Sequence, residues 1–304
     1  MTDALTAFVS RELSTPLRDV IAEAADRLAR KLGGVAVLFY GSNLRTGALD
    51  GLLDFYVLTR GSRAPAWHTV VTGWLWPDVS FHEFQIGPHT LRAKVAVMQI
   101  DTFEKAARGA MLDTTVWTRF VQPAALAWVR SADVEARVVA AVASAAITAA
   151  RFAAVIGPVE GRVIEYWQAL FRETYRAELR VEPPGRETQI LTYDPERYAA
   201  LLPIAWSADG VAFERHGAVV APKLSAEDCR YFVRAWLIRA RTGKALNLAR
   251  LVKAAFSFEG AARYGLWKIE RHTGIRVPLT PWRERHPVLS APGVLWRVFR
   301  ATPQ

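Results

Sequence analysis

The stretch VAVLFYGSN, residues 35–43, decides the fold of this chain, and LLDFYVLT at residues 52–59 is its companion. Each contains a short apolar run bounded by turn residues, a pattern typical of a buried strand. Gly-Ser-Asn ends the first run as a turn. A third run, residues 90–100, is apolar and β-branched near its end, and it predicts another strand. These three strands predict a sheet.

Helical patterns surround the predicted strands. Apolar residues recur at helical spacing from Thr6 to Leu32, and Gly33-Gly34 ends the pattern. Residues 64–76 predict a second helix, between the second and third strands. This order of elements indicates the α+β class, with a mixed sheet.

The rest of the chain is dominated by helical patterns. We expect a strand-containing domain at residues 1–130, a mainly helical domain at 131–242 and a basic C-terminal extension at 243–304. The later elements are predicted at 102–110, 133–156, 159–179, 194–202, 226–242 and 246–256 as helices, and at 211–220 as a short β ribbon. Glu182-Pro183-Pro184-Gly185-Arg186 breaks the helical pattern, and four prolines divide the tail into short pieces.

The formal net charge of the 304-residue chain is +10, and it is concentrated at one end. Residues 230–304 contain 15 Lys and Arg against 3 acidic residues, a net of +12, so the rest of the chain carries −2. This asymmetry favours a polyanionic partner, either nucleic acid or anionic lipid. Trp236, Trp267, Trp282 and Trp296 lie in the same basic tail. Tryptophan favours the lipid headgroup region, although aromatic side chains also pack inside proteins.

Several features exclude other classes of protein. Cys229 is the only cysteine, which excludes a disulfide framework and a cysteine-rich metal site. Charged residues interrupt the first 13 positions, where a signal peptide would have an apolar core. The most apolar stretch, residues 138–150, is shorter than the ~20 residues of a membrane-spanning helix and predicts a buried, alanine-rich helix. We therefore expect a cytoplasmic protein that binds the membrane peripherally.

The turn at Gly41-Ser42, followed by Asp54 in the next strand, is the segment that can carry chemistry. Glycine lets the backbone approach a phosphate closely. A serine hydroxyl and free backbone N–H groups can hold phosphate oxygens. An aspartate on the adjacent strand can bind Mg²⁺, which bridges those oxygens. A Gly-Ser turn between strands can also be purely structural.

The pattern resembles the signature of the polymerase-β-like nucleotidyltransferase superfamily. That signature begins with a hydrophobic residue, a glycine and then either glycine or serine. After a gap it continues with an aspartate and a second acid, which are separated by one residue. Gly41, Ser42 and Asp54 match it, whereas Tyr56 stands at the position of the second acid. The resemblance implies that superfamily's mixed sheet, with Asp54 as a metal ligand. The candidates for a further carboxylate are Glu83 and Asp101.

Within that superfamily, residues 35–125 resemble the mitochondrial type of phosphatidate cytidylyltransferase. That family carries Tyr-Gly-Ser-Gly, Leu-Asp-Phe, Ala-Trp-His, a lysine in a strand, and an arginine shortly before a proline. The counterparts here are Tyr40-Gly41-Ser42-Asn43, Leu53-Asp54-Phe55, Ala66-Trp67-His68, Lys94 and Arg119. Asn43 replaces the family's last glycine, and Gln122 replaces a lysine.

The resemblance implies that CTP and phosphatidate give CDP-diacylglycerol and pyrophosphate at a membrane surface, with Mg²⁺ as cofactor. It implies catalytic roles for Asp54 and Lys94, with Asp54 also holding the metal. The nucleotide-binding residues implied are Gly41, Ser42, Asn43 and Arg119. CTP, phosphatidate and an anionic membrane surface are the expected partners, in preference to nucleic acid.

The sequence leaves two other functions open. A nucleotidyltransferase of this kind could act on RNA or another acceptor, because a basic tail also suits RNA. The missing second acid at Tyr56 favours instead a catalytically inactive adaptor for nucleic acid or membrane on the same fold. Structural interpretations are open as well: Lys94 could point to solvent, Arg119 could form an ordinary ion pair, and Tyr56 could simply pack.

Overall fold

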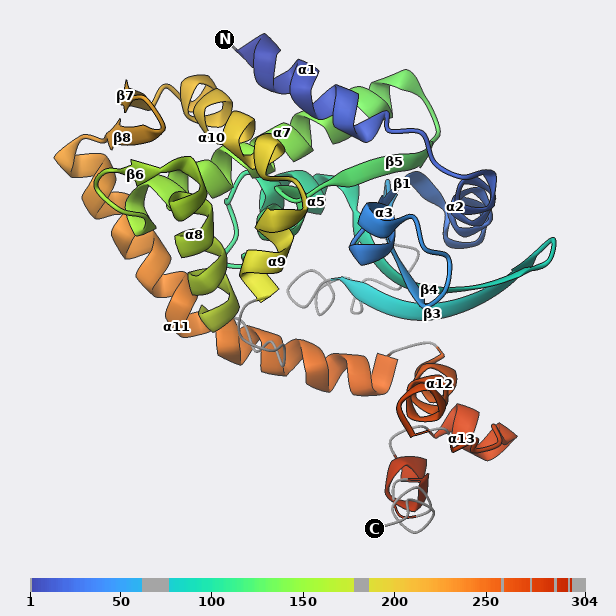
Figure 1. The fold of residues 1–304 in the computed structure, drawn as a ribbon. Coiled ribbons are helices and arrows are strands. Elements are labelled where there is room, and N and C mark those ends of the chain that lie inside the picture. The colour runs from blue at the N-terminus through green and yellow to red at the C-terminus, as the bar shows by residue number, and fades with distance from the viewer. Residues whose placement is uncertain are drawn as a thin grey trace.

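The computed structural model describes residues 2–61, 77–177, 186–257, 260–273, 275–286, 289–294 and 296 of the chain. It belongs to the α+β class, with a five-stranded mixed sheet and 60% helix. Figure 1 shows the sheet between two layers of helices, with the C-terminal helices extending away below it. The described residues do not include the predicted helix at 64–76, with its Ala66-Trp67-His68 motif. They also do not include residues 182–185 of the predicted break.

The main sheet has the strand order β3-β4-β2-β1-β5. Its strands are β1 (Gly34–Tyr40), β2 (Leu52–Thr59), β3 (Asp78–Ile86), β4 (His89–Gln99) and β5 (Ala124–Val129). Only β2 and β4 run parallel, and the other neighbours are antiparallel. The strands predicted from the sequence correspond to β1, β2 and β4, whereas β3 and β5 were not predicted.

Two hydrophobic clusters cover the two faces of this sheet. Helix α2 (Asp19–Leu32) packs on one face, against the side chains of Val37, Phe55 and Val95. The opposite face is covered by α5 (Ile100–Ala107), α6 (Thr115–Phe120) and α7 (Ala132–Ile156). The prediction of one helix over residues 6–32 was wrong at its N-terminal half. The structure has a separate helix α1 (Thr2–Leu13) and then residues 14–18, where Pro16 interrupts a helix by removing a backbone donor.

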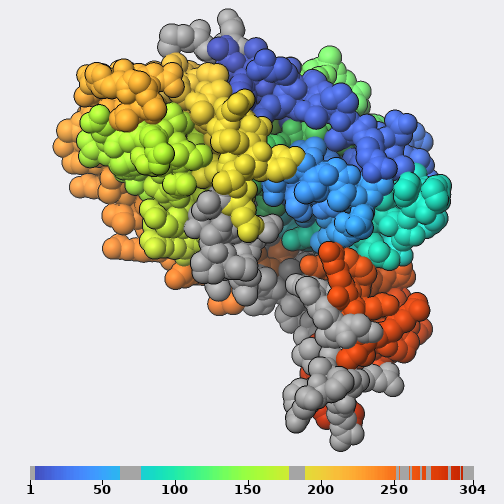
Figure 2. Space-filling model, in the orientation of Figure 1, coloured from blue at the N-terminus to red at the C-terminus, as the bar shows by residue number. Residues whose placement is uncertain are grey.

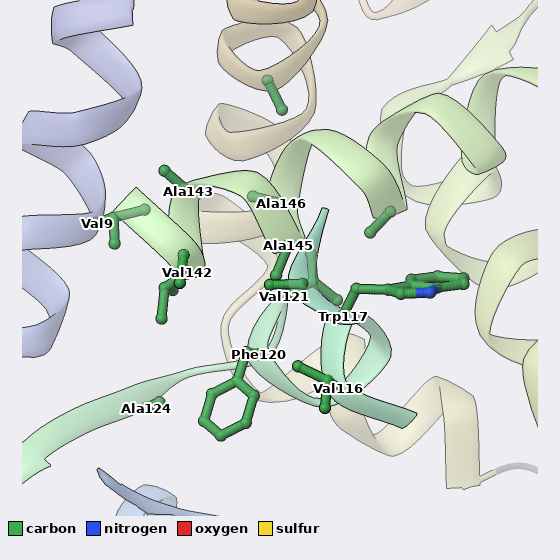
Figure 3. Packing of buried hydrophobic residues seen from close by; sticks show 14 of the residues in the cluster. Val9, Val116, Trp117, Phe120, Val121, Ala124, Val142, Ala143, Ala145 and Ala146 are labelled. Atoms are coloured by element: carbon green, nitrogen blue, oxygen red, sulfur yellow. The ribbon is translucent and has the colours of Figure 1, made fainter. Parts of the chain in front are cut away.

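Helix α7 is the 25-residue centre of the larger cluster. Among the described residues it is the one helix long and apolar enough to cross a membrane, but 67% of its most apolar window is buried inside the protein. Figure 3 shows the close packing that alanine allows here: Ala145 of α7 lies beside Val121, at the end of α6, whereas Ala143 lies on the side of α7 toward Val9 of α1. The predicted buried, alanine-rich helix at 138–150 is confirmed.

The helical part that follows shares this core. It contains α8 (Val163–Ala177), α9 (Arg186–Tyr193), α10 (Pro195–Asp209) and a small sheet of β6 (Gly161–Arg162), β8 (Val219–Lys223) and β7 (Ala212–His216). The predicted β ribbon at 211–220 corresponds to β7 and β8. One continuous cluster of buried side chains extends from Leu5 to Trp236. The predicted boundary at 130/131 therefore falls between two elements that share a single core.

The C-terminal part begins with α11 (Ala226–Ser257), a single 32-residue helix where two helices and a boundary at 242/243 were predicted. Gly243 lies in its interior because α11 passes close to the end of α8. A Cβ at that position would lie 2.6 Å from the carbonyl oxygen of Ala177. Two shorter helices follow, α12 (Ala261–Thr273) and α13 (Pro281–Arg285). Pro281 is the first residue of α13, a position where proline favours a helix.

Candidate functional site

The sheet places three of the candidate residues side by side. Asp54 on β2 is in register with Tyr40 on β1 and with Lys94 on β4. Residues in register on neighbouring strands project from the same face of a sheet, with Cβ atoms about 5 Å apart. Tyr40, Asp54 and Lys94 therefore form a row across three strands, on the face that also carries the larger hydrophobic cluster.

Gly41 connects this row to the short helix α3 (Ser42–Thr46). Its φ of 91° and ψ of −163° belong to a region of backbone space that is almost restricted to glycine. A Cβ on residue 41 would also lie 2.8 Å from Oδ2 of Asp54. Glycine thus serves two purposes here, because it permits the turn into α3 and lets the backbone lie directly against the aspartate carboxylate.

A cavity of about 250 Å³ opens above the row. Its walls come from the sheet, α3, α6, α8 and α9, and its lining residues are Tyr40, Gly41, Ser42, Arg45, Asp54, Lys94, Arg119, Gln122, Pro123, Tyr175 and Ile190. Five of the residues singled out in the sequence, Gly41, Ser42, Asp54, Lys94 and Arg119, lie together in this cavity. Residues from the helical part, on α8 and α9, close it on the side away from the strands.

Arg119, near the end of α6, is held over an aromatic ring. Its Cζ lies 4.9 Å from the centroid of the Tyr40 ring. A planar guanidinium stacks favourably on an aromatic face, and its N–H donors lie at the edge of the group, in its own plane. Its guanidinium lines the cavity.

Arg45 is a lining residue that the sequence reasoning missed. It lies on α3, three positions after Ser42, so one helical turn brings both side chains to the same cavity. Its Cζ lies 5.9 Å from the centroid of the Tyr193 ring on α9, and the Tyr193 hydroxyl donates to the carbonyl oxygen of Arg45. The signal that could have revealed Arg45 is its spacing from Ser42 within the Gly-Ser-Asn-Leu-Arg segment.

The charges in the cavity are unbalanced. Burial raises the pKa of Asp54, and the positive charges of Lys94, Arg119 and Arg45 act in the opposite direction. Three cationic side chains and one carboxylate thus line the cavity among the described residues. A concave site with a surplus of positive charge attracts an anionic ligand, and phosphate groups match the donors of arginine and lysine.

Asn43 does not line the cavity, although the sequence pointed to it as a nucleotide-binding residue. Its side chain is 8% exposed and donates to the carbonyl oxygens of Ala48, at 3.0 Å, and Asp50, at 3.3 Å. The Ser42 hydroxyl donates to its amide oxygen at 3.3 Å. The structure therefore gives Asn43 a local role in shaping the turn between α3 and β2, which is a common use of asparagine.

Tyr56 packs where a second acid was expected. It is 3% exposed and lies against the rings of Tyr40, Phe103 and Phe120. Burial raises its pKa, so the phenol stays neutral. The alternative carboxylates do not line the cavity: Glu83 pairs with Arg92 at 3.0 Å, and Asp101 pairs with Arg137 at 2.6 Å.

A metal site in this cavity has few protein ligands. The described residues contain no group of three or more His, Cys, Asp or Glu side chains that could hold a metal ion. Of the residues that the structure describes, Asp54 alone presents a carboxylate to the cavity, with the hydroxyl of Ser42 nearby on the lining. Mg²⁺ is often held by one or two carboxylates together with substrate phosphates and water. Asp54 therefore fits Mg²⁺ only as part of a complex with a phosphorylated substrate.

The comparisons with known proteins add no assignment. No protein-family model matches the chain, and a search of curated proteins found no match. The functional argument therefore depends on the residues of the cavity.

Proposed function

We propose that the chain is a nucleotidyltransferase of the polymerase-β-like type and, more specifically, a Mg²⁺-dependent CTP:phosphatidate cytidylyltransferase. The observation that carries the proposal is the cavity in which Ser42, Asp54, Lys94 and Arg119 meet. Their order along the chain matches the family motifs, and their positive surplus suits a triphosphate. The proposal also agrees with the basic, tryptophan-containing tail.

The proposed reaction is an in-line displacement at phosphorus. A phosphate oxygen of phosphatidate attacks the α-phosphorus of CTP, a new P–O bond forms, and the bond from the α-phosphorus to the β-phosphate oxygen breaks to release pyrophosphate. The nucleophile is already an anion, so the protein needs no strong base. Its contribution is to position both substrates and to neutralise charge that develops in the transition state.

Six of the lining residues have a place in this scheme. Ser42 and the backbone around Gly41 hold oxygens of the triphosphate. Lys94 and Arg119 neutralise the transferred phosphate and the leaving pyrophosphate. Arg45 adds a third cation on the side of α3. When bound, Mg²⁺ neutralises further charge on the phosphates, and Asp54 is its protein ligand.

The proposed acceptor is a lipid in an anionic membrane. Trp282 and Trp296, in the basic tail, have exposed fractions of 55% and 57%, and Leu289 is 70% exposed. Tryptophan at a surface suits the headgroup region, and each nearby Lys or Arg contributes about 1 kcal/mol at an anionic surface. Trp236 is instead buried against Phe152, so the tail tryptophans divide between the core and the surface.

The test is a transfer assay with labelled CTP, Mg²⁺ and vesicles that contain phosphatidate, followed by lipid extraction. We expect label in the lipid from the wild type and from Asp50→Asn, and none from Asp54→Asn. Asp50 is the matched control because its side chain is exposed in the segment just before β2 and does not line the cavity.

Parallel reactions with an RNA acceptor separate the alternatives. Label in RNA but not in lipid would replace phosphatidate by a nucleic-acid acceptor. Absence of transfer to any acceptor by a folded wild-type protein that still binds vesicles or RNA would favour the inactive adaptor, in line with the packed Tyr56.

A further inference from the structure

The C-terminal helices are attached to the sheet beside the candidate site. On α11, Lys253 is 2.5 Å from a carboxylate oxygen of Asp78, at the start of β3. Arg250 on the same helix is 2.6 Å from Asp113, in the segment that precedes α6. Both cationic side chains are largely buried, with exposed fractions of 12% and 13%. These ion pairs hold the end of α11 against the domain that carries the cavity. Figure 1 shows α11 leading to α12, which lies below β3 and β4, and Figure 2 shows the same C-terminal segment in red below the blue and green surface of the sheet domain.

Helix α12 then lies directly on the outer strands. Gly260, with a φ of 80°, precedes it, and a Cβ there would lie 2.8 Å from the carbonyl oxygen of Phe81. The ring of Tyr264 packs on the ring of Phe81, with centroids 5.8 Å apart, and stacks on Trp267 at 6.2 Å. Arg92 of β4 lies over the ring of Trp267 at 5.8 Å. The position of Tyr264 is thus set by contacts with both strands.

This position extends the row of the candidate site. Phe81 on β3 is in register with Lys94 on β4, and Lys94 is in register with Asp54. The row therefore continues through Lys94 to Phe81, and Tyr264 covers its far end on the same face of the sheet. Tyr264 is not among the lining residues of the 250 Å³ cavity but lies one strand beyond Lys94, so a ligand that extends from Asp54 across Lys94 toward β3 would reach it.

The electrostatics agree with this arrangement. Tyr264 is partly buried, and its pKa is raised first by burial and then by the negative charge of Asp54. The phenol consequently stays protonated at neutral pH and can donate a hydrogen bond. A neutral donor is suited to a phosphate oxygen and adds no negative charge next to Asp54.

We propose that the Tyr264 hydroxyl donates a hydrogen bond to a phosphate oxygen of the nucleotide bound over Asp54 and Lys94. Helix α12 is then a wall of the substrate site, in addition to any role of the tail at a membrane. This inference rests on the proposed function, since it names a further contact for the same nucleotide.

The test compares the binding of CTP with Mg²⁺ in the wild type and in Tyr264→Phe, by isothermal titration calorimetry. Phenylalanine retains the ring that packs on Phe81 and removes only the hydroxyl, so we expect a folded protein with about tenfold weaker binding. Tyr231→Phe is the matched control. Tyr231 is 66% exposed on the early part of α11, and its substitution should leave the affinity unchanged.

A second measurement does not depend on catalysis or nucleotide. In protein labelled at the tyrosine Cζ with ¹³C, NMR titration gives the pKa of Tyr264 in the wild type and in Asp54→Asn. Removal of the neighbouring negative charge should lower that pKa.

The outcomes are distinguishable. A wild type that binds no nucleotide overturns the proposed function and this inference together. A wild type that binds CTP, with equal affinity in Tyr264→Phe, overturns this inference alone. A Tyr264 pKa unchanged by Asp54→Asn also overturns it, since the phenol would not be near the carboxylate.

Discussion

Replacement of Gly41 by alanine should damage the site more than it damages the fold. The backbone at residue 41 has a φ of 91° and a ψ of −163°, a conformation that costs a residue with a Cβ about 1–3 kcal/mol. The new Cβ would also lie 2.8 Å from Oδ2 of Asp54, whereas ordinary contact begins at 3.4 Å. The carboxylate, the turn or both must therefore move.

The magnitude follows from those two terms. A loss of 1–3 kcal/mol lowers Tm by about 2–10 °C in a protein of this size. Displacement of the Asp54 carboxylate by part of an ångström should lower the proposed nucleotidyl transfer roughly tenfold to a hundredfold, because the rate falls steeply when a catalytic group is misplaced. Differential scanning fluorimetry measures the first quantity, and the labelled-CTP assay measures the second.

Gly47→Ala is the matched control. Gly47 ends α3 with a φ of 69°, but a Cβ there would meet nothing within 4 Å. Alanine at this position carries the cost of a left-handed conformation, about 1–2 kcal/mol, without touching the carboxylate. We expect a lower Tm with nearly full transfer activity. Wild-type activity in Gly41→Ala, or an equal loss of activity in both variants, would refute the reasoning.

Two further predictions concern stability. Because burial raises the pKa of Asp54 above its ordinary value of 3.8, the folded state binds its proton more tightly than the unfolded state. The ionised Asp54 carboxylate therefore destabilises the folded state as pH rises above 3.8. Asp54→Asn should raise Tm at pH 7 and have little effect on Tm at pH 3. An equal difference in Tm between variant and wild type at both pH values would contradict this. Asp113→Ala removes the buried carboxylate that pairs with Arg250 and should cost about 3 kcal/mol in urea unfolding. Asp133→Ala, which breaks an exposed pair with Arg60 and a hydrogen bond from Ser131, should lower the midpoint much less, and equal midpoints for the two alanine variants would contradict the assignment.

Much of the fold was predictable because its signals are local. The apolar runs at 35–40 and 52–59 are short and bounded by turns, and both are strands in the structure. Strand β3 was missed because it carries Ser80, His82 and Glu83 among its apolar residues, so it lacks a clean alternation. The single helix predicted over 6–32 was wrong because Pro16 was overlooked. The helices predicted at 226–242 and 246–256 are one continuous helix in the structure, with Gly243 in its interior.

Some residues of the candidate site could also be predicted from the sequence, and others could not. Gly41, Ser42 and Asp54 lie within one strand–turn–strand segment, so their proximity could be expected from spacing. Lys94 and Arg119 came from the family resemblance and lie in the same cavity. Asn43 was predicted to bind the nucleotide because of its position in the motif. In the structure its side-chain amide instead donates hydrogen bonds to carbonyl oxygens of the turn. Hydrogen bonds of this kind depend on backbone geometry that a motif does not contain.

The sequence by itself determined the two central strands, the glycine turn between them, the buried alanine-rich helix and the concentration of positive charge in the last quarter. Each depends on residues close together in the chain, whose pattern reflects burial or backbone freedom directly. Only the tertiary structure decided that Arg45 joins the cavity, that Tyr56 packs as a core residue and that α12 places Tyr264 on Phe81, at the end of the row that contains Asp54. Those outcomes depend on strand register and on helix packing between residues far apart in sequence, which local patterns do not encode.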